Sequence, residues 1–228
     1  MSDIASHAAR LGLTFTDLDI LAEALTHRSY LNENKTAKAH NERLEFLGDA
    51  VLELTVTHFL YEKFPLKSEG DLTAYRAALV NTYSLAESAE EMGLNDMLLL
   101  SKGEAKDTGR ARQIILANAF EAVLGAVYLD QGYETARTFV ETHLCPKIDD
   151  IVAKRAWQDA KSRFQELAQE KKGYTPTYKT VREEGPDHDK EFTVSVMVGS
   201  ENIARGDGKS KQEAEQAAAQ AALQKLGW

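Results

Sequence analysis

Residues 40–53 of this 228-residue chain combine carboxylates with helical spacing. The acidic residues recur every three or four positions: Glu42, Glu45, Asp49 and Glu53. A helix would place them on one stripe beside an apolar stripe, where each like-charge pair weakens the helix by about 0.2–0.5 kcal/mol. No Lys or Arg stands four residues further along to offset this repulsion. A hard divalent cation, Mg²⁺ or Mn²⁺, would hold these oxygens, and a solvated acidic face is the simpler alternative.

A second stretch, residues 114–129, is almost wholly apolar and carries two strongly polar side chains, Asn118 and Glu121. A membrane-spanning helix needs about 20 apolar residues, so this shorter run with a central carboxylate predicts a buried core helix and no membrane segment. A buried carboxylate needs a cation from another helix or a metal ion. If the two helices face each other, they supply four oxygen ligands: Glu45, Asp49, Asn118 and Glu121.

The elements that position these residues are predicted from periodicity and from helix-breaking residues. Helical periodicity covers residues 4–30, and the polar segment 32–39 predicts a loop before the first acidic helix. Pro65 ends that helix near residue 64, and Ser68 is a suitable N-cap for the next one. A further helix is predicted at residues 84–92, and a polar loop is predicted at residues 105–112.

The chain changes character after residue 150. A helix at residues 159–172 is followed by alternating segments at 177–184 and 191–198, a short strand at 202–205 and an Ala-rich helix from about 209 to 226. The predicted fold is therefore an N-terminal all-α domain followed by a C-terminal α+β domain of order α-β-β-β-α. The predicted boundaries are 4–150 for the first domain, 151–157 for a linker and 158–227 for the second domain.

Charge and cysteine content restrict the possible partners and compartment. The net charge is −9, and residues 1–150 carry 14 Lys and Arg against 24 Asp and Glu, whereas residues 151–228 carry 13 against 12. Nucleic-acid binding must therefore come from local basic groups and metal ions. Cys145 is the single cysteine, so an intrachain disulfide is excluded, and residues 1–10 lack a signal peptide. A cytoplasmic location is expected.

The run Asn41-Glu-Arg-Leu-Glu-Phe-Leu-Gly-Asp49 closely resembles the signature of the ribonuclease III family. The resemblance implies that Glu45 and Asp49 are metal-site residues. The helix at 114–129 resembles the family's second motif, with Glu121 on its essential glutamate, so Asp49 and Glu121 are the implied catalytic pair. Many members have Asp where this chain has Asn118, which offers only a neutral carbonyl oxygen.

The resemblance also covers residues around this centre. It implies that Glu42 and Glu69 lie near the cleavage site, and Arg76 is within possible reach of a phosphate. His27 stands at a predicted helix end, and we interpret it as structural and not as a general base. Phe46 is a core residue by its apolar character, whereas the resemblance places it at a dimer contact.

The C-terminal pattern resembles the double-stranded RNA-binding domain over its whole length, with Gly206-Asp-Gly-Lys-Ser-Lys211 leading into the last helix. Lys209 and Lys211 at a helix N-terminus suit phosphate binding. Three further residues match positions that touch the RNA minor groove: Gln165, Glu166 and His188.

Together the resemblances imply a homodimeric, Mg²⁺-dependent endoribonuclease that hydrolyses double-stranded RNA to products with 5′-phosphate and 3′-hydroxyl ends. Mn²⁺ is an expected substitute for Mg²⁺. The expected role is processing of ribosomal and other structured RNA precursors. The alternative is a non-catalytic double-stranded RNA-binding protein whose first domain is a dimerisation scaffold. A small-molecule metallohydrolase is disfavoured by the attached RNA-binding domain.

Overall fold

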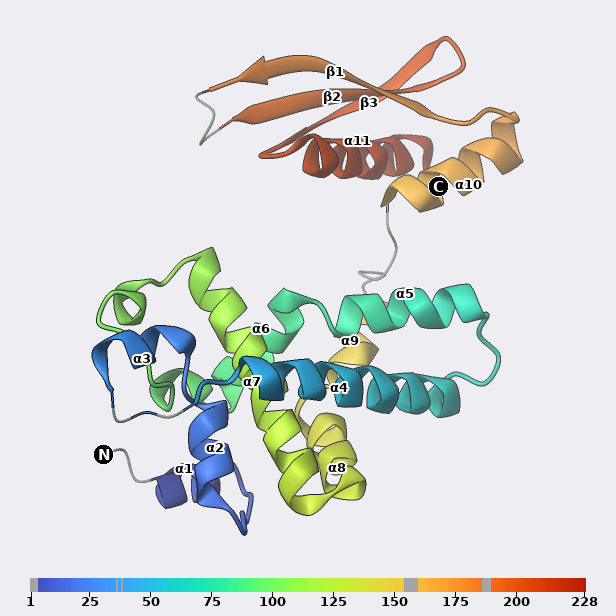
Figure 1. Ribbon diagram of the computed structural model, residues 1–228. Coiled ribbons are helices and arrows are strands. Elements are labelled where there is room, and N and C mark those ends of the chain that lie inside the picture. The colour runs from blue at the N-terminus through green and yellow to red at the C-terminus, as the bar shows by residue number, and fades with distance from the viewer. Residues whose placement is uncertain (1–3, 36, 38, 154–159, 186–189) are drawn as a thin grey trace. The chain divides into compact units, whose positions relative to one another are not determined.

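The protein is described here by a computed structural model, which covers residues 4–35, 37, 39–153, 160–185 and 190–228 (Figure 1). The chain divides into two compact units, Met1–Trp157 and Gln158–Trp228. The first three residues of the predicted linker, 151–153, are not a linker but the end of a helix that reaches Ala153. The rest of that linker lies outside the described residues.

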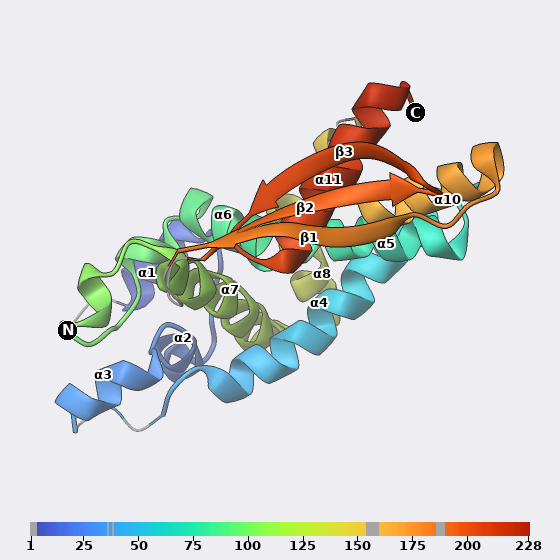
Figure 2. The same ribbon diagram turned by 90° about the horizontal axis from the view of Figure 1, so that it is seen from above.

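The N-terminal unit is helical, as predicted. Its α-helices are α1 (Ile4–Arg10), α2 (Leu18–Ala24), α3 (Arg28–Glu33), α4 (Glu42–Lys63), α5 (Glu69–Leu79), α6 (Thr82–Glu91), α7 (Arg110–Gln131), α8 (Tyr133–His143) and α9 (Lys147–Ala153). Short 3₁₀ turns lie at Leu94–Asp96 and Glu104–Lys106. The long helices α4 and α7 cross each other, as both views show (Figures 1 and 2).

Helix α7 forms the centre of this unit's hydrophobic core. Leu116, Phe120 and Val123 are fully buried, and α7 packs against α4, α6 and α8. By length and composition α7 is able to cross a membrane, but most of its apolar window is buried inside the unit. It is therefore the predicted core helix.

Three differences from the predicted helices have local causes. The helical segment 4–30 is divided, and Gly12 ends α1 with a left-handed φ of 67°. Helix α7 begins at Arg110, inside the predicted polar loop. This start was not predicted because the exposed first turn has no apolar periodicity. Helix α8 was not predicted, although its buried Ala136, Phe139 and Val140 have helical spacing.

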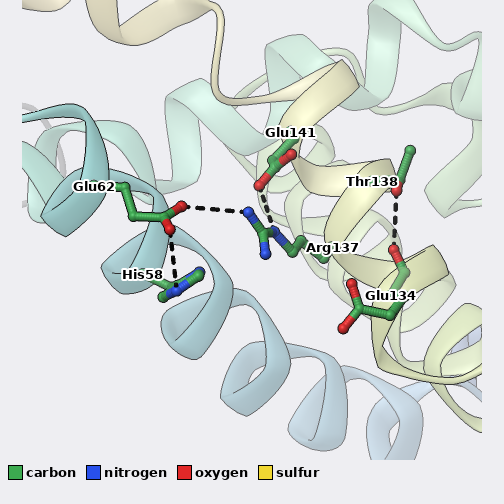
Figure 3. Close-up of polar contacts among 6 residues, drawn as sticks. All are labelled: His58, Glu62, Glu134, Arg137, Thr138 and Glu141. Carbon is green, nitrogen blue, oxygen red and sulfur yellow. Dashed lines mark hydrogen bonds and ion pairs between the residues drawn. The ribbon is translucent and has the colours of Figure 1, made fainter.

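Polar contacts fix the two helices that pack beside α4. Ser68 caps α5 as predicted: its Oγ accepts from the Asp71 amide at 3.1 Å, and Asp71 Oδ2 accepts from the Ser68 amide at 3.4 Å. On α8, the Arg137 guanidinium lies 2.7 Å from Glu141 Oε1 and 3.4 Å from Glu62 Oε2 of α4 (Figure 3). Arg137 therefore joins α8 to the C-terminal half of α4.

The C-terminal unit has the predicted α-β-β-β-α order. Its elements are α10 (Ala160–Lys172), β1 (Thr177–Glu184), β2 (Glu191–Val198), β3 (Glu201–Gly208) and α11 (Lys211–Leu226). The strands form an antiparallel sheet of order β1-β2-β3, with both helices on one face (Figure 1). Phe164, Val194, Val196 and Leu223 are buried in its separate core.

Strand β3 is longer than predicted because two glycines that suggest a turn are part of it. A Cβ on Gly206 would lie 2.1 Å from the Ala218 amide nitrogen, and one on Gly208 would lie 2.5 Å from the Ala214 amide nitrogen. These glycines therefore allow β3 to press directly against α11.

Candidate active site

Two glycines allow α4 and α7 to cross with their backbones in contact. A Cβ on Gly48 would lie 1.8 Å from the carbonyl oxygen of Glu121, and one on Gly125 would lie 2.3 Å from the carbonyl oxygen of Leu44. Both distances are far below van der Waals contact, and the obstructing atoms belong to the backbone. The crossing therefore requires glycine at both positions, and it sets the acidic turns of α4 against the polar turn of α7.

The four predicted ligands interact at this crossing. The Asn118 amide donates a hydrogen bond to the carboxylate of Glu45. Burial, followed by the charges of Glu42 and Asp49, raises the pKa of Glu45, and the bond from Asn118 opposes this shift. Burial and then the charges of Asp49, Glu45 and Glu53 raise the pKa of Glu121 to about 7. The site therefore concentrates negative charge in a partly buried place.

No protein cation neutralises this charge in the described part of the chain. Glu42 pairs with Arg28 and Glu53 pairs with Arg76, whereas Glu45, Asp49 and Glu121 form no ion pair with Lys or Arg among the described residues. The alternative explanation for Glu121 was a salt bridge to Lys or Arg. The described residues form no such salt bridge with it.

The donor chemistry fits a hard divalent cation, since three carboxylates and one amide oxygen are available and Asp49 remains exposed. Within the described ranges, no three His, Cys, Asp or Glu side chains are already gathered as a metal-ligand cluster.

The two residues predicted near the cleavage site are not joined to these four. Glu42 Oε1 accepts from Arg28 at 3.0 Å, although its charge reaches Glu45. Glu69 accepts at 3.0 Å from Thr73 on its own helix, and its charge is not among those acting on Glu45 or Glu121.

His27 has a structural role, as predicted. It caps α3, and its Nδ1 accepts from the Ser29 amide at 3.3 Å, while burial lowers its pKa. The preceding Thr26 carbonyl accepts from the Asn41 amide at 2.9 Å. This segment therefore fixes the start of α4.

Sequence reasoning did not single out two residues of this site and did not foresee the effect of a third. Gly48 and Gly125 were not singled out, although a glycine inside a helix costs about 1 kcal/mol relative to alanine and therefore calls for a packing explanation. Glu53 belonged to the acidic stripe, but its effect on Glu121 comes from another helix and leaves no local trace in the sequence.

The predicted RNA-contact residues lie on the surface of the C-terminal unit where they are described. Gln165 and Glu166 are exposed on α10, and His188 lies outside the described residues. Lys209 is exposed, with Nζ 3.1 Å from Glu191 Oε1. Lys211 Nζ lies 3.9 Å from Glu183 and over the Phe192 ring. Exposed pairs such as these are weak enough for phosphate to displace.

Phe46 is not a core residue, because 81% of its side chain is exposed. It stands on α4 beside an apolar pocket of about 390 Å³. Leucine, valine, alanine and tyrosine side chains line this pocket: Leu47, Ala50, Val51, Leu54, Tyr128 and Tyr133. The interpretation of Phe46 as core is therefore wrong, and an apolar surface lies on this side of α4.

Comparison with known proteins agrees with this architecture. The Ribonuclease-III-like family matches residues 17–148, and the double-stranded RNA binding motif matches residues 160–226. A protein named Ribonuclease 3 from Bdellovibrio bacteriovorus is 47% identical over 94% of this chain and 92% of its own length. Ribonuclease 3 from Bacillus licheniformis is 48% identical over 95% of this chain and 87% of its own length.

A solved structure matches the N-terminal unit. The nuclease domain of ribonuclease III from Campylobacter jejuni superposes with a TM-score of 0.56 at 41% identity, covering 66% of this chain and 96% of that one. The agreement extends over both units of the sequence, and the helical unit also agrees in three dimensions. The chain belongs to the ribonuclease III family.

Proposed function

We propose that this protein is a Mg²⁺-dependent endoribonuclease specific for double-stranded RNA. The observation that supports the proposal is the crossing of α4 and α7, where the charges of Glu45 and Asp49 act on Glu121 and no Lys or Arg among the described residues neutralises them. The double-stranded RNA binding motif supplies the substrate class. The matched relatives carry an enzyme's name, so they give no support to a non-catalytic RNA-binding protein.

The proposed site residues have different roles. Asp49 and Glu121 are the catalytic pair and would hold the cation together with Glu45 and the Asn118 carbonyl oxygen, while the Asn118 amide orients the Glu45 carboxylate. When bound, Mg²⁺, or Mn²⁺ in its place, activates a water molecule and stabilises the charge of the phosphodiester transition state. Glu42 and Glu69 stand near the scissile bond. The products carry 5′-phosphate and 3′-hydroxyl ends.

Two copies of the chain form the working enzyme. The exposed Phe46 and the neighbouring pocket beside Leu54 support an apolar contact between copies. A structure of the Campylobacter jejuni nuclease domain, 41% identical, is named for flexibility in a region involved in dimer formation. The homodimer positions two sites to cut opposite strands of one duplex.

The RNA-binding unit holds the substrate through phosphate and minor-groove contacts. Lys209 and Lys211 contact phosphates, and Gln165, Glu166 and His188 face the minor groove. The expected substrates are structured precursors of ribosomal, messenger and transfer RNA in the cytoplasm, without a membrane partner.

A cleavage assay with Glu121→Gln tests the metal-site assignment. The variant keeps the shape of the side chain but removes one ligand charge, so cleavage of a long RNA duplex in Mg²⁺ should fall at least about 100-fold, since changes outside the ligand shell alone cost about 10–100-fold. Binding of the duplex should stay within about twofold, because the second unit is untouched. The control is wild-type protein in Mg²⁺ and then in EDTA.

Undiminished turnover by Glu121→Gln would remove Glu121 from the site. Tight duplex binding by wild-type protein with no cleavage in either Mg²⁺ or Mn²⁺ would favour the non-catalytic alternative.

A further inference from the structure

Arg76, which the sequence placed within reach of a phosphate, contacts two residues of α4. Its Nε lies 3.0 Å from Glu53 Oε2, and its Nη1 donates to Thr57 Oγ1 at 2.8 Å. Glu53 and Thr57 are one turn apart on α4, so a single guanidinium on α5 holds two successive turns of the helix that carries Asp49. A planar guanidinium with several donors suits such a two-point contact better than an ammonium does.

Helix α5 is held to the core mainly through its C-terminal half, and Leu72 in its N-terminal half is partly buried against the core. Tyr75 and Leu79 are its buried residues, and both lie in its second half. Glu69 begins the helix, is exposed, and lines a pocket of about 440 Å³ between α4 and α5 together with Lys67 and Arg76. The apolar anchors secure the fold of α5, while the Arg76 contacts fix its position along α4.

The partner of Arg76 also matters to the metal site. Glu53 lies one turn beyond Asp49 on the acidic stripe, and its charge acts on Glu121. Without Arg76, the Glu53 carboxylate would be one more unneutralised anion beside the cluster and would be free to rotate. Arg76 therefore holds this carboxylate at a defined place while it fixes α5.

We propose that Arg76 is a positioning residue for the cleavage reaction: through Glu53 and Thr57 it fixes the place of α5 along α4, and it holds the Glu53 carboxylate whose charge acts on Glu121. This inference rests on the proposed endoribonuclease function. Arg76 itself touches neither the substrate nor the metal, so its loss should lower kcat and leave the apparent affinity for RNA unchanged.

The test compares Arg76→Met with Arg137→Met in the full-length protein. Arg137 is a matched control because it also joins a neighbouring helix to α4 through a carboxylate, Glu62, but at the far end of the helix (Figure 3). At saturating Mg²⁺, Arg76→Met should lower kcat about tenfold or more, since small misplacements cost up to about 100-fold, with KM for duplex RNA within about twofold. Arg137→Met should keep kcat within about twofold of wild type. Arg76→Lys should fall between wild type and Arg76→Met.

A mutant cycle identifies the partner. Glu53→Gln breaks the same ion pair, so Glu53→Gln with Arg76→Met should lose no more kcat than Arg76→Met alone. Melting curves check that each variant is folded. If Arg76→Met does not fold, the kcat of Arg76→Lys tests the inference, and a kcat equal to that of wild type would overturn it. A rise in KM alone would make Arg76 a phosphate contact and overturn the inference, and so would unchanged kcat or an equal loss in Arg137→Met. Absence of cleavage by wild-type protein would refute the proposed function itself.

Discussion

Asn118 is the one uncharged member of the proposed ligand set, and its amide has a defined partner. It donates a hydrogen bond to Glu45, so it orients a carboxylate and also offers a neutral carbonyl oxygen. Asn118→Asp exchanges this donor for another charge. We expect it to retain cleavage and lower the Mg²⁺ concentration for half-maximal rate about threefold to tenfold, because ligand charge tunes cation affinity. Asn118→Ala should raise that concentration.

Mg²⁺ titrations of the cleavage rate, with melting curves in EDTA, check both variants. Without a cation, Asn118→Asp should melt below wild type, since a carboxylate then faces Glu45 without a donor. An unchanged Mg²⁺ requirement in both variants would show that Asn118 is outside the site.

Glu121 makes the stability of the metal-free protein depend on pH. In the fold its pKa is raised from 4.5 to about 7, so between these values the folded chain holds a proton that the unfolded chain has released. The contribution of Glu121 to stability is therefore present at pH 4.5 and is lost as pH rises to about 7. Relative to Glu121→Gln, wild type should lose about 1–2 kcal/mol across this window, after discounting for partial exposure.

Urea unfolding of both proteins in EDTA at several pH values measures this difference directly. Saturating Mg²⁺ should remove the loss of wild-type stability with rising pH, because the cation binds the ionised carboxylate of Glu121 and lowers its pKa. A constant difference between wild type and Glu121→Gln from pH 4.5 to 8 would contradict the shared negative charge at the crossing.

At the residue scale, the sequence suggested candidate ligands but not their contacts. Helical spacing placed Glu45 and Asp49 on one acidic stripe, because period is a local property of the chain, and the family resemblance singled them out together with Glu121. The bond from Asn118 to Glu45 and the capture of Arg76 by α4 each join two different helices. Such pairings depend on how the helices cross, which local spacing does not specify.

At the scale of elements, the crossing of α4 and α7 depends on Gly48 and Gly125. We expect Gly125→Ala to destabilise the protein by about 3 kcal/mol or more, because its Cβ would lie 2.3 Å from the Leu44 carbonyl oxygen and overpacking against backbone cannot relax cheaply. Cleavage should fall as well, since separating the helices separates the ligands. Urea unfolding and the cleavage rate are measured together.

Gly70→Ala is the matched control for that substitution. Gly70 also lies in a helix, but the nearest atom to an added Cβ is 3.9 Å away, in the Ser68 side chain. Alanine should be neutral there or stabilise by up to about 1 kcal/mol. Equal effects at Gly125 and Gly70 would mean that helix propensity, and not the crossing, explains the loss.

The elements were predictable where strong local chemistry marks their ends. Pro65 and the Ser68 capping box define the turn between α4 and α5, and the limits of β1 and β2 match their predicted ranges. The first turn of α7 was missed because it is polar and exposed. The end of β3 was missed because Gly206 and Gly208 serve close packing against α11 and not a turn.

At the scale of the whole molecule, each unit has its own hydrophobic core and its own electrostatic character. One core joins the N-terminal helices, and the other joins α10, the sheet and α11. Residues 1–150 carry a net charge of −10 and residues 151–228 carry +1, so all of the excess negative charge lies in the N-terminal part of the chain. Metal binding and RNA binding are therefore assigned to different parts of the chain.

This division predicts the effect of removing residues 158–228. The remaining chain keeps its core and metal-site residues, so it should stay folded and retain weak Mg²⁺-dependent cleavage at low salt. It loses Lys209 and Lys211 together with the whole RNA-binding unit. Each phosphate contact contributes about 0.9 to the slope of log affinity against log salt on a regular duplex, so the truncated protein should bind RNA with a shallower slope. Affinity at physiological salt should fall about 100-fold or more.

Binding isotherms and cleavage rates over a salt series test the division, with the melting temperature as a check on folding. The double variant Lys209→Ala, Lys211→Ala in the full-length chain is the graded control. It should lower the slope of log affinity against log salt by about 1.8, which corresponds to two phosphate contacts, and leave kcat at saturating RNA unchanged. If the truncated protein bound duplex as tightly as the full chain, the acidic helical unit would itself hold the RNA. The acidic residues at the crossing of α4 and α7 would then lie in a unit that binds RNA tightly, which its net negative charge does not favour.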